Sequence, residues 1–408
     1  MSPQELLPHL FRTEFSKIST VLIKVFGIEH IEMAEDITSE TFLAALETWT
    51  YNGVPPNPNA WLYSVAKNKA KNYINRDQLF SQKIAGELER SYSDVRDFEI
   101  DLSDKNIADS QLQMLFAICQ PSISVEAQIG LSLRILCGFG IEEIANALLT
   151  NKETINKRLY RAKEKLRLEK VRIEFPGEAE INKRLETVLT TLYLLFNEGY
   201  YSESQDNLLR EELCLEAMRL TDLLIENEDT NQPQVNALFA LMCFHASRFR
   251  ARKDRSGAMV LYHDQDEALW DYVLISKGGY FLSRSSQGNK LSKYHLEASI
   301  AYWMTVKADT KEKWESVLQL YNQLLQIEYS PIAALNRTFA LYKANGKEKA
   351  IAEAEKLNLT NNHFYFTLLG ELYKGTDGMK AKQYFNQALS LAKTLTDKQI
   401  LQNKIAGL

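Results

Sequence analysis

The chain has 408 residues, of which 45% are hydrophobic and 25% are charged, so it is long enough for two or three domains and too apolar for a disordered protein. Because its formal net charge is -5, the chain as a whole does not attract nucleic acid, and binding to nucleic acid would need a local basic patch. Only 17 Gly and 9 Pro interrupt a sequence rich in Leu, Ala, Lys and Glu, which predicts an all-α fold.

The sequence lacks the signatures of secreted, membrane and catalytic proteins. No basic segment precedes an apolar one at the N-terminus, and nowhere do 18 apolar residues run together, so we expect a cytoplasmic protein that contacts no membrane. Gly-rich phosphate loops, GxSxG and HExxH are absent and the six histidines are scattered, so we expect no enzyme, metal or cofactor. The cysteine spacing matches no metal site, which predicts buried thiols at Cys119, Cys137, Cys214 and Cys243.

The first segment, residues 1–78, has the pattern of three helices, at 7–25, 31–49 and 58–76. Asn57 is a suitable N-cap for the third helix, and Pro58 fits its first position because the missing N–H costs nothing there. One face of this helix is apolar and the other carries lysines and amides. Between Thr48 and Arg76 there are four Lys or Arg and no acidic residue, which makes a first local basic patch.

An acidic stretch follows this segment. Residues 87–109 contain eight Asp or Glu against three Lys or Arg, a composition typical of a solvated connection. We therefore predict a linker over residues 79–110.

The next segment, residues 111–173, ends in two helices joined by a short turn. Gly138 and Gly140 mark a break before a short helix at 141–148, and a capping box of Thr150 and Glu153 is expected to start the second helix. This is the pattern of a helix-turn-helix, whose second helix enters a major groove of DNA.

The second helix of this pair is amphipathic and basic. Its predicted buried stripe is Ile155, Leu159, Ala162 and Leu166. The residues expected to face outward are Lys152, Asn156, Lys157, Tyr160, Arg161 and Lys163. Residues 152–172 hold nine Lys or Arg and three Glu, a net charge of +6. The alternative to DNA binding is a basic face that simply contacts solvent, but the cap and the turn favour DNA.

The remaining residues, 174–408, have helical patterning without marked charge asymmetry. Near the end, the positions of Leu341 and Ala350 are repeated 31 residues later by Leu372 and Ala381. This spacing is compatible with tetratricopeptide-like helix pairs, and an irregular helical bundle explains it equally well.

Several stretches resemble sigma-70-type RNA polymerase sigma factors of the extracytoplasmic-function class. AEDITSETFLAALETW (34–49) and PNPNAWLYSVAKNKAKNYINR (56–76) resemble their conserved region 2, and residues 124–167 resemble region 4. LYLLFNEGY (192–200), DQDEALWD (264–271) and SPIAALNRTFAL (330–341) resemble the long C-terminal extension of one subgroup. The resemblance thus covers nearly the whole chain.

The resemblance implies a non-catalytic initiation factor that binds bacterial RNA polymerase and promoter DNA. Docking on the clamp helices of the largest subunit is implied for Glu35, Asp36, Glu40, Phe42 and Leu43. Contact with the -10 element is implied for Trp61, Lys67, Asn68, Lys71 and Asn72. Contact with the -35 element, with region 4 near the polymerase flap, is implied for Lys152, Asn156, Lys157, Arg158 and Arg161. The extension, residues 174–408, is expected to modulate activity by contacting the sigma regions or the polymerase.

Two alternatives remain at this point. The carboxylates of the docking helix could serve only to favour a helix N-terminus, and Trp61 and Tyr73 fit a core better than a stacking surface. The whole chain could also be a helical scaffold, or a stand-alone helix-turn-helix regulator that binds DNA without polymerase. Ser39, Asn72 and Asn75 depart from the residues usual in the family, which bears on the -10 preference and on docking strength.

Overall fold

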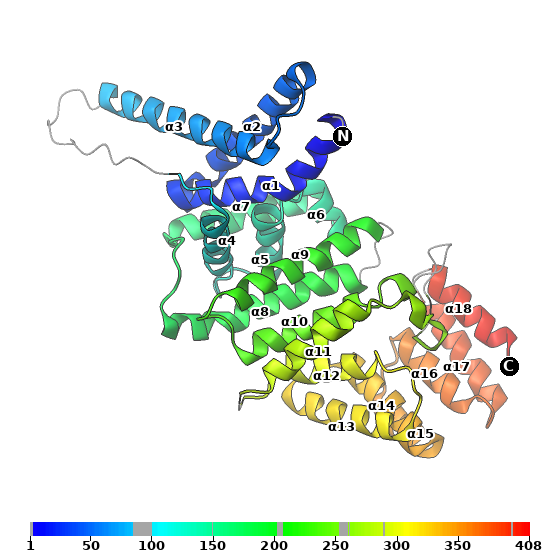
Figure 1. Ribbon diagram of the computed structural model, residues 1–408. Helices are drawn as coiled ribbons and strands as arrows, with labels where there is room; N and C mark the ends of the chain where they lie inside the picture. Colours follow the sequence, from blue (N-terminus) through cyan, green and yellow to red (C-terminus); the bar gives the residue numbers. More distant parts are fainter. Residues whose placement is uncertain are drawn as a thin grey trace. The chain divides into compact units, whose positions relative to one another are not determined.

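The computed structural model describes residues 3–84, 100–148, 150–201, 207–252, 260, 262–288, 290–392 and 395–408. These residues form eighteen α-helices and no strand, so the predicted all-α fold is confirmed (Figure 1). The chain divides into two compact units, Met1–Thr230 (unit 1) and Asn231–Leu408 (unit 2). Among the described residues, no helix is both long enough and apolar enough to cross a membrane.

Unit 1 begins with a module of three helices. They are α1 (Pro3–Phe26), α2 (Ile31–Asn52) and α3 (Pro58–Ile84), and they confirm the three predicted helices. The predicted start of α3 is also confirmed, since Asn57 Oδ1 accepts a hydrogen bond from the Ala60 N–H at 3.0 Å. Tyr63 on α3 donates a 2.5 Å hydrogen bond to the buried carboxylate of Glu14 on α1, which fixes α3 against α1.

A second module of short helices follows. It contains α4 (Asp104–Ile118), α5 (Val125–Leu131), the π-helical turn η2 (Ser132–Leu136), α6 (Ile141–Ala147) and α7 (Lys152–Leu168). The break before α6 depends on Gly138, whose φ of 71° is costly for other residues. Gly140 then donates its N–H to the Glu143 carboxylate at 2.6 Å, at the start of α6.

The start of α7 differs from the sequence prediction. Its N-cap is Asn151, not Thr150, because the Asn151 backbone is extended and its side-chain oxygen accepts the Thr154 N–H at 2.8 Å. The helix-turn-helix pair itself is present as α6 and α7.

The predicted linker at 79–110 overlaps helices at both ends. α3 continues to Ile84 and α4 begins at Asp104. Residues 85–99, which hold much of its acidic sequence, lie outside the described residues.

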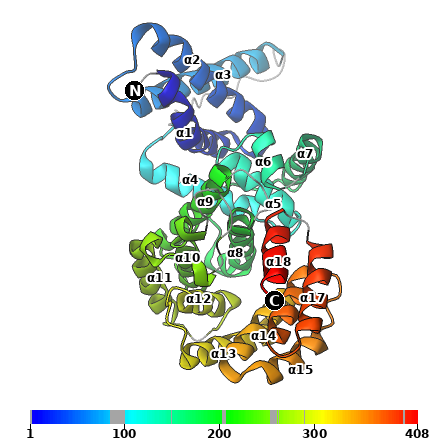
Figure 2. The same cartoon turned by 90° about the vertical axis from the view of Figure 1, so that its right-hand side faces the viewer.

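Unit 1 also includes α8 (Glu178–Tyr201) and α9 (Asn207–Glu226), the first two helices of the predicted extension (Figure 2). They pack against each other, and α8 covers α4 and α5. Thr191 on α8 donates to the Gln128 side chain at 2.8 Å, and Arg219 on α9 donates to the Leu136 carbonyl at 2.9 Å. The compact unit that ends at Thr230 thus includes residues 174–230, the first part of the predicted extension.

Unit 2 contains nine α-helices among its described residues. They are α10 (Pro233–Ala246), α11 (Tyr272–Ser285), α12 (Lys293–Trp303), α13 (Lys311–Ile327), α14 (Pro331–Asn345), α15 (Lys347–Leu357), α16 (His363–Tyr373), α17 (Gly378–Leu391) and α18 (Leu395–Ala406). The two copies of the internal repeat occupy equivalent places: Leu341 on α14 precedes Ala350 on α15, and Leu372 on α16 precedes Ala381 on α17. All four side chains are buried within consecutive helix pairs.

All four cysteines are buried and free of disulfides, as predicted from their spacing. Burial raises the pKa of the Cys119 thiol to about 12, which makes it a poor nucleophile.

Candidate functional site

The outer face of α2 carries part of the predicted docking surface. Asp36 and Glu40 are exposed, and Leu43 is 54% exposed beside them. Glu40 forms an ion pair with Lys69 of α3 at 3.0 Å. Because this pair is largely exposed, it contributes little stability, so a partner could displace Lys69 at small cost.

Phe42 does not belong to this surface. Its ring is 7% exposed and packs against Phe11 at 5.1 Å and Phe15 at 6.3 Å between ring centroids. In this arrangement the ring completes the contact between α1 and α2, so it is not accessible to a partner.

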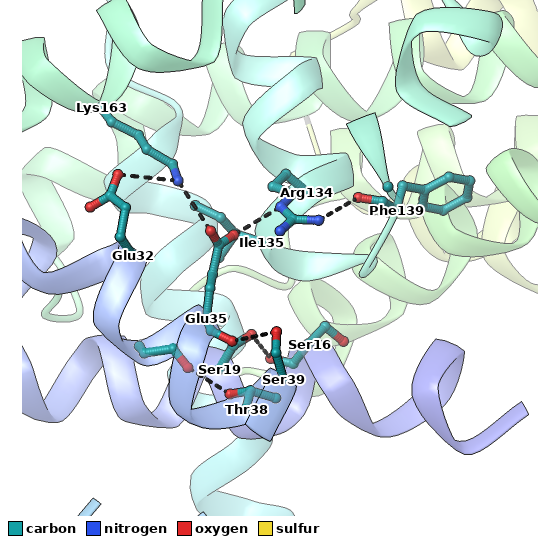
Figure 3. Close-up of polar contacts among 12 residues, drawn as sticks. Ser16, Ser19, Glu32, Glu35, Thr38, Ser39, Arg134, Ile135, Phe139 and Lys163 are labelled. Atoms are coloured by element: carbon teal, nitrogen blue, oxygen red, sulfur yellow. Dashed lines mark hydrogen bonds and ion pairs between the residues drawn. The ribbon is translucent and has the colours of Figure 1, made fainter. Parts of the chain in front are cut away.

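Glu35 is likewise withdrawn from solvent, although it lies on the same helix. Its side chain is 12% exposed and pairs with Arg134 Nε at 2.9 Å and with Lys163 Nζ at 3.3 Å (Figure 3). Arg134 comes from η2 and Lys163 from α7, so both cations belong to the second module. Arg134 also donates to the Phe139 carbonyl at 3.3 Å, which fixes its guanidinium in place.

Glu32 extends this cluster by one helical turn. It pairs with Lys163 at 3.5 Å and with Arg167, also on α7. Burial acts to raise the pKa of Glu32, but a backbone hydrogen bond and the charges of Lys163 and Arg167 outweigh burial and lower it. Both carboxylates are thus compensated by cations of the second module. We call Glu32, Glu35, Arg134, Lys163 and Arg167 the intermodule cluster.

The intermodule cluster corrects one sequence prediction. Lys163 is buried, not outward-facing, because it lies four residues after Leu159 and three before Leu166 and so borders the apolar stripe of α7. That spacing is the signal in the sequence for its inward position. The sequence contains no comparable signal for Arg134.

The outer face of α3 presents amides and a cation. Asn68, Lys71 and Asn72 are exposed, and Lys67 is half-buried. Trp61 is half-buried against Trp49, with ring centroids 5.3 Å apart and an interplanar angle of 65°. This edge-to-face contact agrees with a core role for the indole.

The outer face of α7 exposes most of the residues that the sequence predicts to contact the -35 element. Ile155, Leu159, Ala162 and Leu166 are buried, as predicted. Lys152, Asn156, Lys157 and Arg161 are exposed, and Arg158 is half-buried. The predicted -35 residues are thus presented by a helix that is anchored along its opposite face.

Comparisons with known proteins identify two parts of the chain. Residues 23–79 match the sequence family described as Sigma-70 region 2, and residues 184–286 match a family of unknown function (DUF6596). The chain is 32% identical to an uncharacterized protein of Rhizobium meliloti (strain 1021) over 372 residues, which cover 89% of this chain and 87% of the relative. It is 23% identical over 143 residues to the ECF RNA polymerase sigma factor SigX of Bacillus subtilis (strain 168), covering 35% of this chain and 73% of that protein. No solved structure matches the chain.

Proposed function

The chain belongs to the sigma-70 family and carries a C-terminal helical extension, and we propose that it is an extracytoplasmic-function-type sigma factor that directs polymerase to its own set of promoters. Sigma factors are non-catalytic initiation factors, so this protein is not an enzyme. Their partners are the RNA polymerase core and promoter DNA. We place its action in the cytoplasm, where transcription takes place.

The proposed polymerase contact is on α2. Asp36 and Glu40 offer exposed carboxylates to basic side chains of the clamp helices, and Leu43 offers an apolar contact beside them. Charge complementarity with an apolar centre is the usual composition of a reversible protein interface.

The proposed -10 contact is on α3. Lys67 and Lys71 are suited to phosphate oxygens, and the amides of Asn68 and Asn72 are suited to the edges of exposed bases. Promoter opening requires this combination, because cations hold the backbone while polar groups capture an unpaired base.

The proposed -35 contact is on α7, and its anchored, exposed basic face is the observation that carries the proposal. Lys and Arg side chains can read guanine or hold phosphates, and Asn156 can read adenine. The position of α7 as the second helix of a helix-turn-helix supports entry into a major groove.

The extension is proposed to modulate these activities. Its first helices complete the core of unit 1 through Thr191 and Arg219, and its later helix pairs are proposed to stack in the tetratricopeptide-like manner. Any ligand or protein that altered α8 or α9 would therefore act on a segment built into the same unit as the sigma modules.

In vitro transcription with bacterial core polymerase and a pool of promoter fragments tests the proposal. We expect new discrete transcripts that disappear with Lys157→Ala or Arg161→Ala, since removal of one base contact costs about 1–3 kcal/mol. Lys183→Ala, at an exposed position of α8, is the matched control and should transcribe normally. Sequence-specific DNA binding without polymerase, together with no transcripts and no core binding, would instead identify a stand-alone regulator.

A further inference from the structure

We propose that unit 1 is a closed, polymerase-excluding form of the sigma factor, in which the second module occupies Glu35 until the polymerase replaces it. The inference rests on the proposed function. Under this proposal, Arg134 and Lys163 compete with basic side chains of the polymerase for the carboxylate of Glu35.

The intermodule cluster holds a carboxylate of the predicted docking helix. Glu35 lies on the same helix as the exposed Asp36 and Glu40, yet it is almost withdrawn from solvent by two cations from η2 and α7. A polymerase that approached α2 would find Asp36 and Glu40 accessible and Glu35 already paired. Full docking therefore requires Arg134 and Lys163 to leave.

The contact between the modules continues along α1, which packs against α4 and η2 of the second module. Arg12 pairs with Glu143 at 2.9 Å, and its guanidinium lies 3.8 Å from the centre of the Phe139 ring. Thr20 donates to the Ile135 carbonyl at 3.4 Å. A partner can replace each of these polar bonds, but opening must also expose the surface that α1 packs against α4 and η2.

The distance between promoter elements supplies an independent reason for opening. Elements centred near -10 and -35 lie about 25 base pairs apart, which is roughly 85 Å of B-form DNA. A compact body of 230 residues has an expected radius of gyration of about 17 Å and a diameter of about 45 Å. α3 and α7 of closed unit 1 therefore cannot reach both elements together.

The energetics favour an exchange rather than a spontaneous opening. Separating the modules alone would exchange these ion pairs for water and would also expose the surface that α1 packs against α4 and η2, so the closed form is favoured in the absence of a partner. If polymerase cations take the place of Arg134 and Lys163, Glu35 keeps its charge compensation throughout. A closed form that opens only a few per cent of the time lowers the apparent affinity for polymerase by the same factor.

A reversible cross-link between the modules tests the inference. Glu29, in the turn before α2, and Lys170, after α7, are exposed and line the same cleft of about 480 Å³. We would introduce Glu29→Cys and Lys170→Cys into the full chain and join them with a short bis-methanethiosulfonate reagent, which dithiothreitol cleaves. The four native cysteines are buried and should not react.

The expected result is efficient cross-linking in the free protein, loss of core polymerase binding, and recovery of binding after dithiothreitol. The matched control joins Ala179→Cys and Lys183→Cys, exposed positions one turn apart on α8, and should bind core normally. Equal core binding by the cross-linked and reduced proteins, or failure of labelled cysteines to join, would overturn the closed form while leaving the proposed function intact. Absence of core binding by the unmodified protein would overturn the proposed function and this inference together.

A second variant tests the competition directly. Arg134→Met with Lys163→Met removes the internal cations but leaves the docking carboxylates, and we expect core binding to tighten by about tenfold or more. Lys183→Met, at an exposed position outside the intermodule cluster, is the control and should leave affinity unchanged. Folding of each variant is checked by circular dichroism, and unchanged or weaker binding by a folded double variant contradicts the competition.

Discussion

The position at which the extension is removed should decide whether the sigma modules fold. The sequence boundary suggests a chain that ends after Arg172, whereas the structure indicates a chain that ends after Thr230. Ending at Arg172 removes α8 and α9, and with them every interaction that these helices make with the second module. We expect the shorter chain to be unstable and the longer one to be folded.

The magnitude follows from the hydrogen bonds and the buried surface that the shorter chain would lack. The hydrogen bonds that disappear include three strong ones to the second module: one from Thr191 to Gln128 at 2.8 Å, and two from Arg219 to Gln111 and to a backbone carbonyl, both at 2.9 Å. At about 1 kcal/mol each, they account for roughly 3 kcal/mol. Exposure of the fully buried Phe116, which packs against Phe175 at 5.9 Å, adds about 2–3 kcal/mol. The sum is about 5 kcal/mol, comparable with the whole stability of many domains.

Thermal unfolding and size-exclusion chromatography of the two truncated chains provide the measurement. The chain that ends at Thr230 should elute as a compact species with a cooperative transition. The chain that ends at Arg172 should aggregate, or unfold at a much lower temperature. Equal melting temperatures and elution volumes for the two chains would show that α8 and α9 are dispensable, and would refute the reasoning.

Two further predictions concern unit 2. Gly278→Ala should destabilise unit 2 by about 1–3 kcal/mol, because a Cβ there would lie 2.7 Å from the ring of buried Phe244. At the neighbouring position a Cβ would meet no other atom, so Gly279→Ala should stabilise α11 by up to about 1 kcal/mol. Chemical denaturation measures both changes in the free energy of unfolding, and equal effects would contradict the packing. Burial lowers the pKa of Lys313 to about 8, against an opposing pull from Asp309, so between pH 8 and 10 the unfolded chain binds more protons than the folded one. The free energy of unfolding should therefore rise with pH in that window for the wild type relative to Lys313→Met, and parallel pH profiles would disprove the shift.

Local features of the fold can be predicted from the sequence because neighbouring residues determine them. The N-cap at Asn57 and the buried stripe of α7 each depend on spacings of a few residues. The sequence prediction starts α7 one residue too early because Thr150 and Asn151 are both good caps, and only the backbone conformation selects between them.

Features that depend on distant parts of the chain cannot be predicted in the same way. Glu35 and Lys163 are 128 residues apart, and nothing in either segment identifies the other as its partner. The family resemblance places Phe42 on the surface, although it lies four residues after the buried Thr38 and three before the buried Ala45, a spacing that puts it on the inner face. Most outward positions on α3 and α7 can be predicted, Lys163 being the exception on α7, but the packing of one module on the other cannot.

The two faces of α7 have different contacts, which bears on how the sequences of related proteins can diverge. One face of this 17-residue helix holds Lys163 and Arg167 against the first module, while the opposite face presents Lys157 and Arg161 to solvent. Under the proposed function and the proposed closed form, substitutions on the inner face alter how readily polymerase opens the protein, and substitutions on the outer face alter which promoters it recognises. Responsiveness and target choice could therefore diverge separately among relatives, or be engineered separately, within a single helix.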